Sequence, residues 1–318
     1  MEQSHRRPTP PRRSGCGGVA ATGVRRLRRS SATRADRHPS RADPDRRRRR
    51  PDPHQRLCVQ QRRAPRMVDH NGDRSHTGKR SGVFRRRVVQ NRRVILYVDN
   101  EHASTYERAG DGLLAARTRI TYRLGDLAGD VCLLARYGDV DPGLIDQHGI
   151  RAVFISGHGA PPEVYDEHER EGLCEIIRRG DLPVFGFCGG LQFIADALGV
   201  APVRMGRLPG GAADPHPDYE PGWITELGYE PVRLVGDHPL HDGLGATPVF
   251  RHAHSYHLPT LSDGFVRLAE TDPCPIQLAA HEERPLAGAQ FHPEYWTTDN
   301  PDGERLIRNF LRWAEVTS

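Results

Sequence analysis

The chain has 318 residues and a formal net charge of +5, but its charge is unevenly distributed. The first 93 residues hold 28 of the 46 basic side chains and 7 of the 41 acidic ones, which leaves 18 basic against 34 acidic in the remainder. The larger part is therefore acidic, and the overall charge is no argument for nucleic-acid binding. No run approaches the roughly 18 to 20 apolar residues of a membrane span, and no secretory signal core is present. We expect a cytoplasmic protein without a membrane partner.

Residues 1–92 are expected to form a disordered tail rich in Arg and Pro. Runs such as Arg46 to Arg50 lie among prolines and serines without apolar periodicity, so the segment cannot bury enough surface to offset its ordering entropy. A basic arm can bind nucleic acid or an anionic surface, and an Arg-rich leader can act as a transit peptide. A third interpretation is a misassigned start: Lys79 is the only lysine, which is typical of GC-rich coding sequence, and Met67 is then the true first residue.

Residues 93–318 are predicted to form one α/β domain. Short apolar runs alternate with amphipathic segments, which is typical of a mostly parallel sheet covered by helices on both faces. The length of this part suits one domain better than two. The predicted strands are 94–98, 131–135, 152–155, 183–187, 232–235, 249–251, 265–269, 276–280 and 287–291. The predicted helices are 106–122, 142–148, 163–179, 188–198 and 303–313, and 200–222 is expected to be a loop.

A candidate nucleophile, Cys188, lies in the run Gly-Phe-Cys-Gly-Gly-Leu-Gln at 186–192. An apolar strand ends there and a helix begins, which is the setting of a nucleophile elbow. A tight turn exposes the sulfur at a helix N-terminus, whose partial positive charge favours thiolate. Glycines at 186 and 190 let the strand and the helix approach each other. A lone cysteine between glycines is more often a buried packing residue, so the assignment depends on partners elsewhere in the chain.

Those partners are His292 and Glu294, in the run Gln-Phe-His-Pro-Glu at 290–294. Residues two apart on an extended chain point to the same side, so both side chains are expected to face one site. An imidazole deprotonates a cysteine best when a carboxylate fixes its tautomer and supports its charged form. A single His-x-Glu is more often a surface pair. Its combination with an elbow cysteine favours a catalytic triad.

The two motifs together resemble the class I, or triad, glutamine amidotransferase family, over the chain from about Val94 to Phe310. The resemblance implies a flavodoxin-like three-layer fold and a glutaminase that needs no cofactor. It implies that Cys188 attacks the side-chain amide of glutamine and that ammonia leaves. Water activated through His292 then hydrolyses the glutamyl thioester, and Glu294 orients His292.

The same resemblance places an oxyanion hole at the backbone N–H groups of Gly189 and His158. The family most often has Gly-Gly-Pro where this chain has Gly157-His158-Gly159. A side chain at the central position restricts the backbone relative to glycine. The sequence therefore leaves open whether the oxyanion hole is preformed.

Glutamine itself is the expected ligand of a small set of residues near the triad. By resemblance these are Gly157, Gln192, His254, Ser255 and Tyr256. Three histidines at 252, 254 and 257 suggest a metal site, but no acidic or cysteine cluster accompanies them along the chain, so no metal site is expected. The six cysteines show neither metal spacing nor a disulfide framework, and reduced thiols are expected.

The expected partner is a separate synthase or synthetase that accepts the ammonia. The chain has no Gly-x-x-x-x-Gly-Lys loop and no lysine after residue 93, so we expect ATP-dependent activation on another polypeptide. Asp99-Asn100 is similar to chorismate-linked amidotransferase subunits, but Gly189-Gly190 differs from their Leu-Gly. Two alternatives stay open: a γ-glutamyl hydrolase without ammonia transfer, and a non-enzymatic binding module. The presence of all three triad residues favours the amidotransferase.

Overall fold

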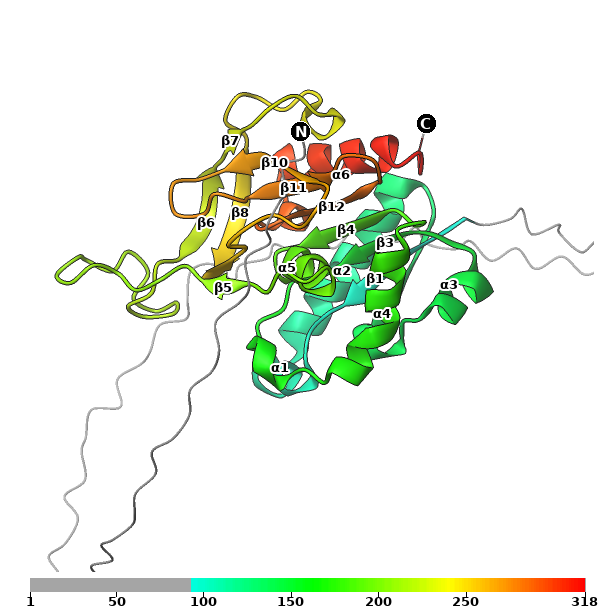
Figure 1. Cartoon of the computed structure of the whole chain (residues 1–318), viewed down its shortest axis with the longest axis horizontal. Coiled ribbons are helices and arrows are strands. Elements are labelled where there is room, and N and C mark those ends of the chain that lie inside the picture. Colours follow the sequence, from blue (N-terminus) through cyan, green and yellow to red (C-terminus); the bar gives the residue numbers. More distant parts are fainter. Residues whose placement is uncertain (1–92, 318) are drawn as a thin grey trace, which may run out of the picture. The chain divides into compact units, whose positions relative to one another are not determined.

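The computed structural model describes residues 93–317. The predicted tail at 1–92 and the predicted start at Met67 lie outside these residues. The described part is built on an eight-stranded sheet with the order β2-β1-β3-β4-β12-β11-β10-β7 (Figure 1). Five neighbouring strands run parallel: β2 (Val131–Arg136), β1 (Val94–Asp99), β3 (Ile150–Ile155), β4 (Val184–Phe187) and β12 (Leu286–Ala289). Three antiparallel strands complete the sheet: β11 (Leu278–His281), β10 (Phe265–Glu270) and β7 (Arg233–Leu234).

Helices lie on both faces of this sheet, as Figure 1 shows. One face is covered by α2 (Asp111–Ala128) and α6 (Asp302–Trp313), and the other by α3 (Pro142–His148), α4 (Glu167–Arg179) and α5 (Gly189–Ala197). A short helix, α1 (Ala103–Ala109), precedes α2. Within residues 93–317, no helix has both the length and the apolar character needed to cross a membrane. The predicted three-layer, mostly parallel α/β fold is confirmed.

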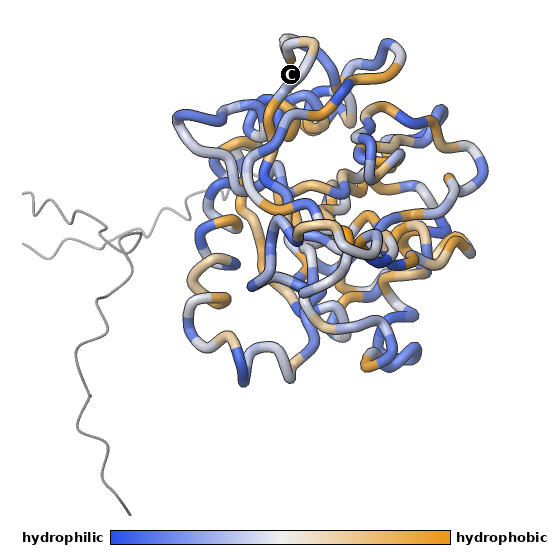
Figure 2. Tube along the Cα trace, turned by 90° about the vertical axis from the view of Figure 1, so that its left-hand side faces the viewer, coloured by the Kyte–Doolittle hydropathy of each residue, from blue (hydrophilic) through white to orange (hydrophobic). Residues whose placement is uncertain are grey.

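Strand β1 illustrates why both faces are covered. Ile95 and Tyr97 pack into the cluster beneath α2 and α6, whereas Leu96 and Val98 pack into the cluster beneath α4 and α5. Successive side chains of a strand point to opposite faces, so an unbroken apolar run demands a cover on each side. Hydrophobic residues accordingly lie along the central strands and hydrophilic ones along the outer loops (Figure 2). Burying each large apolar side chain contributes about 1.5 to 3 kcal/mol.

Two short ribbons extend the domain beside the central sheet. One pairs β5 (Val203–Arg204) with β9 (Tyr256–His257), and the other pairs β6 (Glu226–Pro231) with β8 (Val249–His254). The N–H of His292 donates to the carbonyl of Arg251 over 2.7 Å, which ties β8 to the segment after β12. The segment 251–257 is thereby brought beside His292. Short 3₁₀ turns cover Tyr137–Asp139, Pro162–Val164, Pro239–His241 and Pro293–Tyr295.

Several predicted boundaries were wrong, each for a local reason. The helix predicted at 106–122 is two helices, because Gly110 takes a positive φ of 60° between α1 and α2. The helix predicted at 163–179 begins at Glu167, where the side chain of Asp166 accepts the His168 N–H as an N-cap. Strand β6 was missed, and the predicted loop 200–222 contains β5.

Candidate active site

Cys188 occupies a strained turn between β4 and α5. Its φ of 48° and ψ of −105° are rare for a residue with a side chain. The Cys188 N–H donates to the Ala289 carbonyl over 2.7 Å, which ties the turn to β12. A Cβ atom on Gly186 would overlap the Gly190 carbonyl carbon, and one on Gly190 would overlap the Ile155 carbonyl oxygen. The predicted strand, elbow and helix are therefore present, and their close approach requires both glycines.

The Cys188 sulfur lies in a buried polar setting, with 5% of the residue exposed. The Gln290 side-chain amide donates to Sγ over 3.4 Å, and the Gln192 amide donates to Gln290 Oε1 over 3.1 Å. Gln192 thus holds Gln290 as well as lining the cavity described below. Gln290 was not predicted as a site residue. Its position two residues before His292 was the sequence signal that pointed to it.

His292 and Glu294 form a pair, with Nδ1 and Oε1 2.8 Å apart. The expected reason was wrong: β12 ends at Ala289, and Pro293–Tyr295 is a 3₁₀ turn rather than extended chain. The turn carries Glu294 back under His292, and the carboxylate is fully buried there. Burial disfavours the charged imidazole, but the negative charge of Glu294 and the Cys188 sulfur outweigh burial and raise the pKa of His292. The raised pKa favours the charged form of the imidazole.

The loop at 156–160 faces this pair. A side chain on Gly157 would lie 2.9 Å from His292 Cε1 and 3.4 Å from Cys188 Cβ, so the loop passes beside both residues. The Gly157 carbonyl accepts from Arg117 Nη2 over 2.8 Å and from Ser156 Oγ over 2.9 Å. Two donors therefore hold this carbonyl, and neither Arg117 nor Ser156 lines the cavity described below.

Peptide geometry then sets the direction of the next N–H group. All peptide bonds between described residues are trans, so the His158 N–H points opposite to the Gly157 carbonyl and away from Arg117. Arg117 is itself fixed by a buried ion pair, in which Nε lies 2.8 Å from Asp99 Oδ1 and the side chains are 4% and 7% exposed. Within residues 93–317, the His158 N–H has no hydrogen-bond acceptor. The N–H of Gly189, the first residue of α5, is likewise free of an intrahelical partner.

The remainder of the loop is anchored by Glu101. Its carboxylate accepts from the Gly159 N–H over 2.7 Å and from the Ala160 N–H over 3.2 Å. The His158 ring lies edge-on to Tyr165, and its Nδ1 is 2.9 Å from the Ala160 carbonyl. Burial lowers the pKa of His158, which favours the neutral ring. The His158 side chain therefore helps to anchor the loop at 156–160.

A cavity of about 280 Å³ opens over the elbow and collects most of the predicted site. The predicted residues that line it are His158, Cys188, Gln192, His254, Ser255 and Tyr256. Gly157 does not line it and lies against His292 instead.

The segment 200–222, which was predicted to be a loop, contributes three further lining residues, Arg204, Tyr219 and Glu220. Arg204 Nη1 is 2.7 Å from Glu220 Oε2, and its guanidinium lies over the ring of Tyr256. The cavity therefore presents a cation and an anion side by side. The sequence gave no signal that Arg204 and Glu220 line the cavity, because each is an isolated charged residue in a predicted loop.

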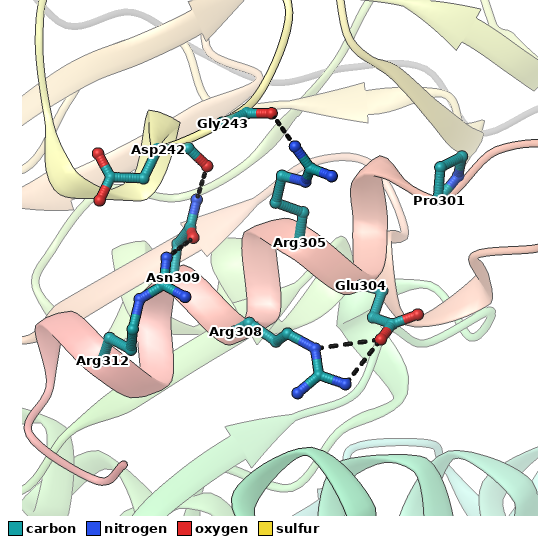
Figure 3. Close-up of a pocket in the computed structure, with 8 residues that line it drawn as sticks. All are labelled: Asp242, Gly243, Pro301, Glu304, Arg305, Arg308, Asn309 and Arg312. Carbon is teal, nitrogen blue, oxygen red and sulfur yellow. Dashed lines mark hydrogen bonds and ion pairs between the residues drawn. The ribbon is translucent and has the colours of Figure 1, made fainter. Parts of the chain in front are cut away.

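A larger hollow of about 450 Å³ runs along α6 (Figure 3). Its three arginines already have partners: Arg305 donates to the Gly243 carbonyl, Arg308 pairs with Glu304, and Arg312 donates to Asn309. None of the triad residues lines it. The chemistry thus belongs to the smaller cavity.

Comparisons with known proteins agree with this geometry. The class-I glutamine amidotransferase family model matches residues 140–313, more than half of the chain. A glutamine-hydrolyzing GMP synthase subunit from Methanococcoides burtonii is 34% identical over 148 residues, which cover 46% of this chain and 68% of that protein. Glutamine-hydrolyzing GMP synthase of Phenylobacterium zucineum is 32% identical over 186 residues, which cover 58% of this chain and 31% of that protein.

A solved structure shows the same fold. A candidate GMP synthase subunit protein of Thermoplasma acidophilum superposes with a TM-score of 0.52 at 24% identity, covering 70% of this chain and 94% of that one. The residues that match the family model include the elbow and the residues that line the cavity. The chain therefore belongs to the class I glutamine amidotransferase family and is an enzyme of that kind.

Proposed function

We propose that this chain hydrolyses glutamine with Cys188, His292 and Glu294 and supplies the ammonia to a separate synthetase subunit of the GMP synthase type. The observation that carries the proposal is the strained elbow cysteine beside a buried, carboxylate-paired imidazole whose pKa is raised. Relatives that are named as single subunits of GMP synthase support a separate partner, since such a name denotes one part of a larger enzyme.

The first half of the reaction forms a thioester. The Cys188 thiolate attacks the side-chain amide carbon of glutamine, and the carbonyl electron pair moves onto oxygen. The N–H groups of His158 and Gly189 stabilise this oxyanion, each contributing about 2.7 to 4 kcal/mol in comparable enzymes. The His292 imidazolium gives its proton to the leaving nitrogen, and ammonia departs as the C–N bond breaks.

The second half regenerates the enzyme. Neutral His292 takes a proton from water, whose oxygen attacks the thioester carbon. The same two N–H groups hold the second oxyanion, and collapse breaks the C–S bond to release glutamate and the Cys188 thiolate. Throughout, Glu294 accepts a hydrogen bond from the Nδ1–H of His292, which keeps Nε2 available for proton transfer.

We further propose that the oxyanion hole is preformed. Arg117 and Ser156 hold the Gly157 carbonyl, and Glu101 holds the two peptides that follow. Rotation of the 157–158 peptide would break two hydrogen bonds, one of them charge-assisted. In this proposal the loop therefore keeps its His158 N–H aimed at the site before glutamine binds.

Recognition of glutamine as an amino acid is assigned to the opposite wall of the cavity. The guanidinium of Arg204 suits an α-carboxylate, and the carboxylate of Glu220 suits an α-ammonium. The volume of about 280 Å³ fits a single amino acid. His254, Ser255 and Tyr256 complete that wall.

The test measures ammonia released from glutamine by the purified chain. Cys188→Ala is expected to abolish release, while Cys174→Ala, on α4 away from the cavity, is expected to leave it unchanged. Adding the synthetase subunit of a GMP synthase, with glutamine as the only nitrogen source, is expected to give GMP. Turnover of γ-glutamyl peptides at an equal or greater rate would instead favour the hydrolase. Release that survives Cys188→Ala would refute the triad.

A further inference from the structure

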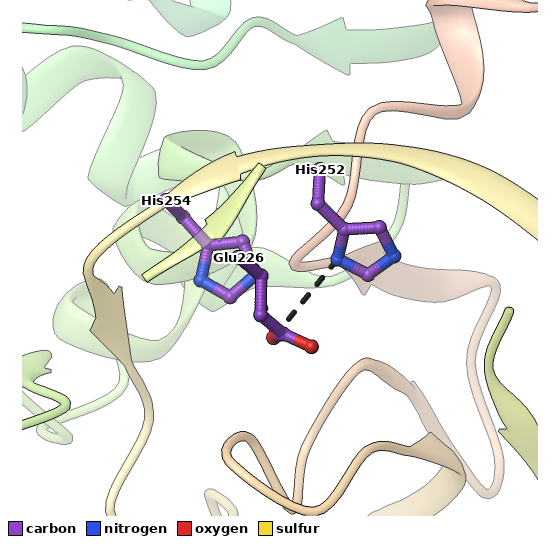
Figure 4. A group of neighbouring side chains, drawn as sticks. All are labelled: Glu226, His252 and His254. Carbon is purple, nitrogen blue, oxygen red and sulfur yellow. Dashed lines mark ion pairs between the residues drawn. The ribbon is translucent and has the colours of Figure 1, made fainter. Parts of the chain in front are cut away.

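A buried cluster of metal-ligating side chains lies on the β6–β8 ribbon. His252 and His254 are two apart on β8, so they share one face, and Glu226 on β6 is the cross-strand partner of His254. Figure 4 shows the Glu226 carboxylate beside both rings. Glu226 Oε2 is 3.1 Å from His254 Nε2 and 4.0 Å from His252 Nδ1. One ligand atom from each residue lies within 4.8 Å of the others.

The hydrogen bonding of these side chains is incomplete. His252, His254 and Glu226 are only 0%, 3% and 9% exposed. Within the described residues, neither ring nitrogen of His252 has a hydrogen-bond partner. A buried polar group left unpaired destabilises the fold, so this arrangement favours a bound ligand.

The neighbours of the cluster orient it as a metal site requires. His254 Nδ1 is 3.1 Å from the Tyr256 carbonyl and donates to it, so Nε2 is the ring nitrogen that faces Glu226. Either a metal cation between Nε2 and the carboxylate or a proton on Nε2 makes this contact favourable, and the experiment below separates the two. Gln277 donates to the same carboxylate and holds it in place.

We propose that Glu226, His252 and His254 bind one zinc-type divalent cation. Two imidazoles and one carboxylate are a common zinc ligand set, and water takes the fourth position. Bonds of 2.0 to 2.2 Å in a tetrahedron place ligand atoms roughly 3.4 Å apart. The separation of 3.1 Å between His254 Nε2 and Glu226 Oε2 is close to this, and His252 Nδ1, at 4.0 Å from Glu226 Oε2, has to move closer. No metal site was expected from the sequence, because no acidic or cysteine cluster accompanies the three histidines along the chain. The acid comes from the neighbouring strand.

The position of the cluster lets the cation restrain one wall of the cavity. His254 and the next residue, Ser255, line the cavity over Cys188. A cation held by both strands of the ribbon restrains this wall of the cavity. It lies on the wall rather than at the reacting atoms, so the proposal does not depend on the proposed function.

The experiment titrates Co²⁺ into the metal-stripped full-length protein and follows visible absorption, which four-coordinate cobalt gives strongly. One equivalent is expected to bind, and Zn²⁺ is expected to displace it and to raise the thermal unfolding midpoint. His252→Phe, which keeps a ring beside Phe291, and Glu226→Gln are each expected to abolish the signal. Two controls are expected to keep it: Cys188→Ser, and His281→Phe at a buried histidine of β11.

Each contrary result overturns the proposal. Absence of the cobalt signal in the unaltered protein would mean that His254 and Glu226 form only an ion pair. A signal that survives both cluster variants would place the cation elsewhere, and loss in Cys188→Ser would place it on the nucleophile. Circular dichroism of each variant shows whether it is folded, and if His252→Phe is not, Glu226→Gln decides.

Discussion

Arg117→Lys tests the oxyanion loop without removing a charge. The guanidinium of Arg117 donates to Asp99 and to the Gly157 carbonyl from different nitrogens. A lysine ammonium pairs with Asp99 but cannot keep both contacts in the same geometry. The Gly157 carbonyl is then held only by Ser156 Oγ, at 2.9 Å, and the 157–158 peptide gains freedom to rotate.

The expected loss follows from the remaining contact. Complete removal of one oxyanion donor lowers kcat by about 10²- to 10³-fold. Because Ser156 still holds the carbonyl, we expect a loss of about 10- to 100-fold in kcat, with little change in KM. Steady-state ammonia release measures both constants. Arg119→Lys, at an exposed position of the same helix, is the matched control and is expected to be unaffected.

Two further measurements distinguish a role of Arg117 in holding the oxyanion loop from a general disturbance of the active site. Glutamate γ-semialdehyde binds as a thiohemiacetal whose oxygen occupies the oxyanion hole, so its affinity should fall by the same factor as kcat. Alkylation of Cys188 by iodoacetamide needs the thiolate but not the hole, and its rate should stay unchanged. An unaltered kcat, or a parallel fall in kcat and alkylation, would refute the reasoning.

The remaining predictions concern the acid, the elbow and the tail. Glu294→Gln should lower kcat by about 10²-fold and move the alkaline limb of the kcat/KM profile to lower pH, because the Glu294 charge raises the pKa of His292; an unmoved limb would contradict this cause. Because folding raises the pKa of His292, its protonation stabilises the fold fully at pH values below the ordinary histidine pKa, and this contribution is lost as the pH rises through the raised pKa. Alkaline conditions should therefore lower the urea midpoint more in the unaltered protein than in Glu294→Gln. Gly190→Ala should destabilise by about 1 to 3 kcal/mol or more in urea unfolding, because its Cβ would overlap the Ile155 carbonyl oxygen; an unchanged midpoint would mean a looser elbow. A shortened chain beginning at Met67 should keep kcat and thermal midpoint, and a marked loss of either would assign the basic segment a role.

Local pattern was sufficient for the framework of the fold. The apolar run at 94–98 and the alternation of such runs with amphipathic segments predicted a two-sided parallel sheet, because each signal lies within one element. Boundaries failed where one residue decides the local structure, as at Gly110 and Asp166. Strand β6 was missed because Gly228 and Pro231 interrupt it and most of its side chains are half-buried or exposed.

The candidate site also contains residues that could be predicted from local motifs and residues that could not. Cys188, His292 and Glu294 could be named from two short motifs, in which spacing carries the chemistry. Arg117 and Glu226 could not, because their contacts with Gly157 and with His254 span 40 and 28 positions and exist only after folding. The prediction that His292 and Glu294 lie together was right, but the extended chain offered as its reason was wrong. A turn beginning at Pro293 brings them together.

The most direct test of the central claim is to trap the intermediate. The protein is mixed with glutamine, quenched in acid during turnover and digested, and its peptides are weighed by mass spectrometry. A glutamyl group is expected in thioester linkage on the peptide that contains Cys188, and it is expected to be absent from the Cys188→Ala variant. Ammonia release with no such adduct, or with the adduct on Cys174 or another cysteine, would contradict that claim.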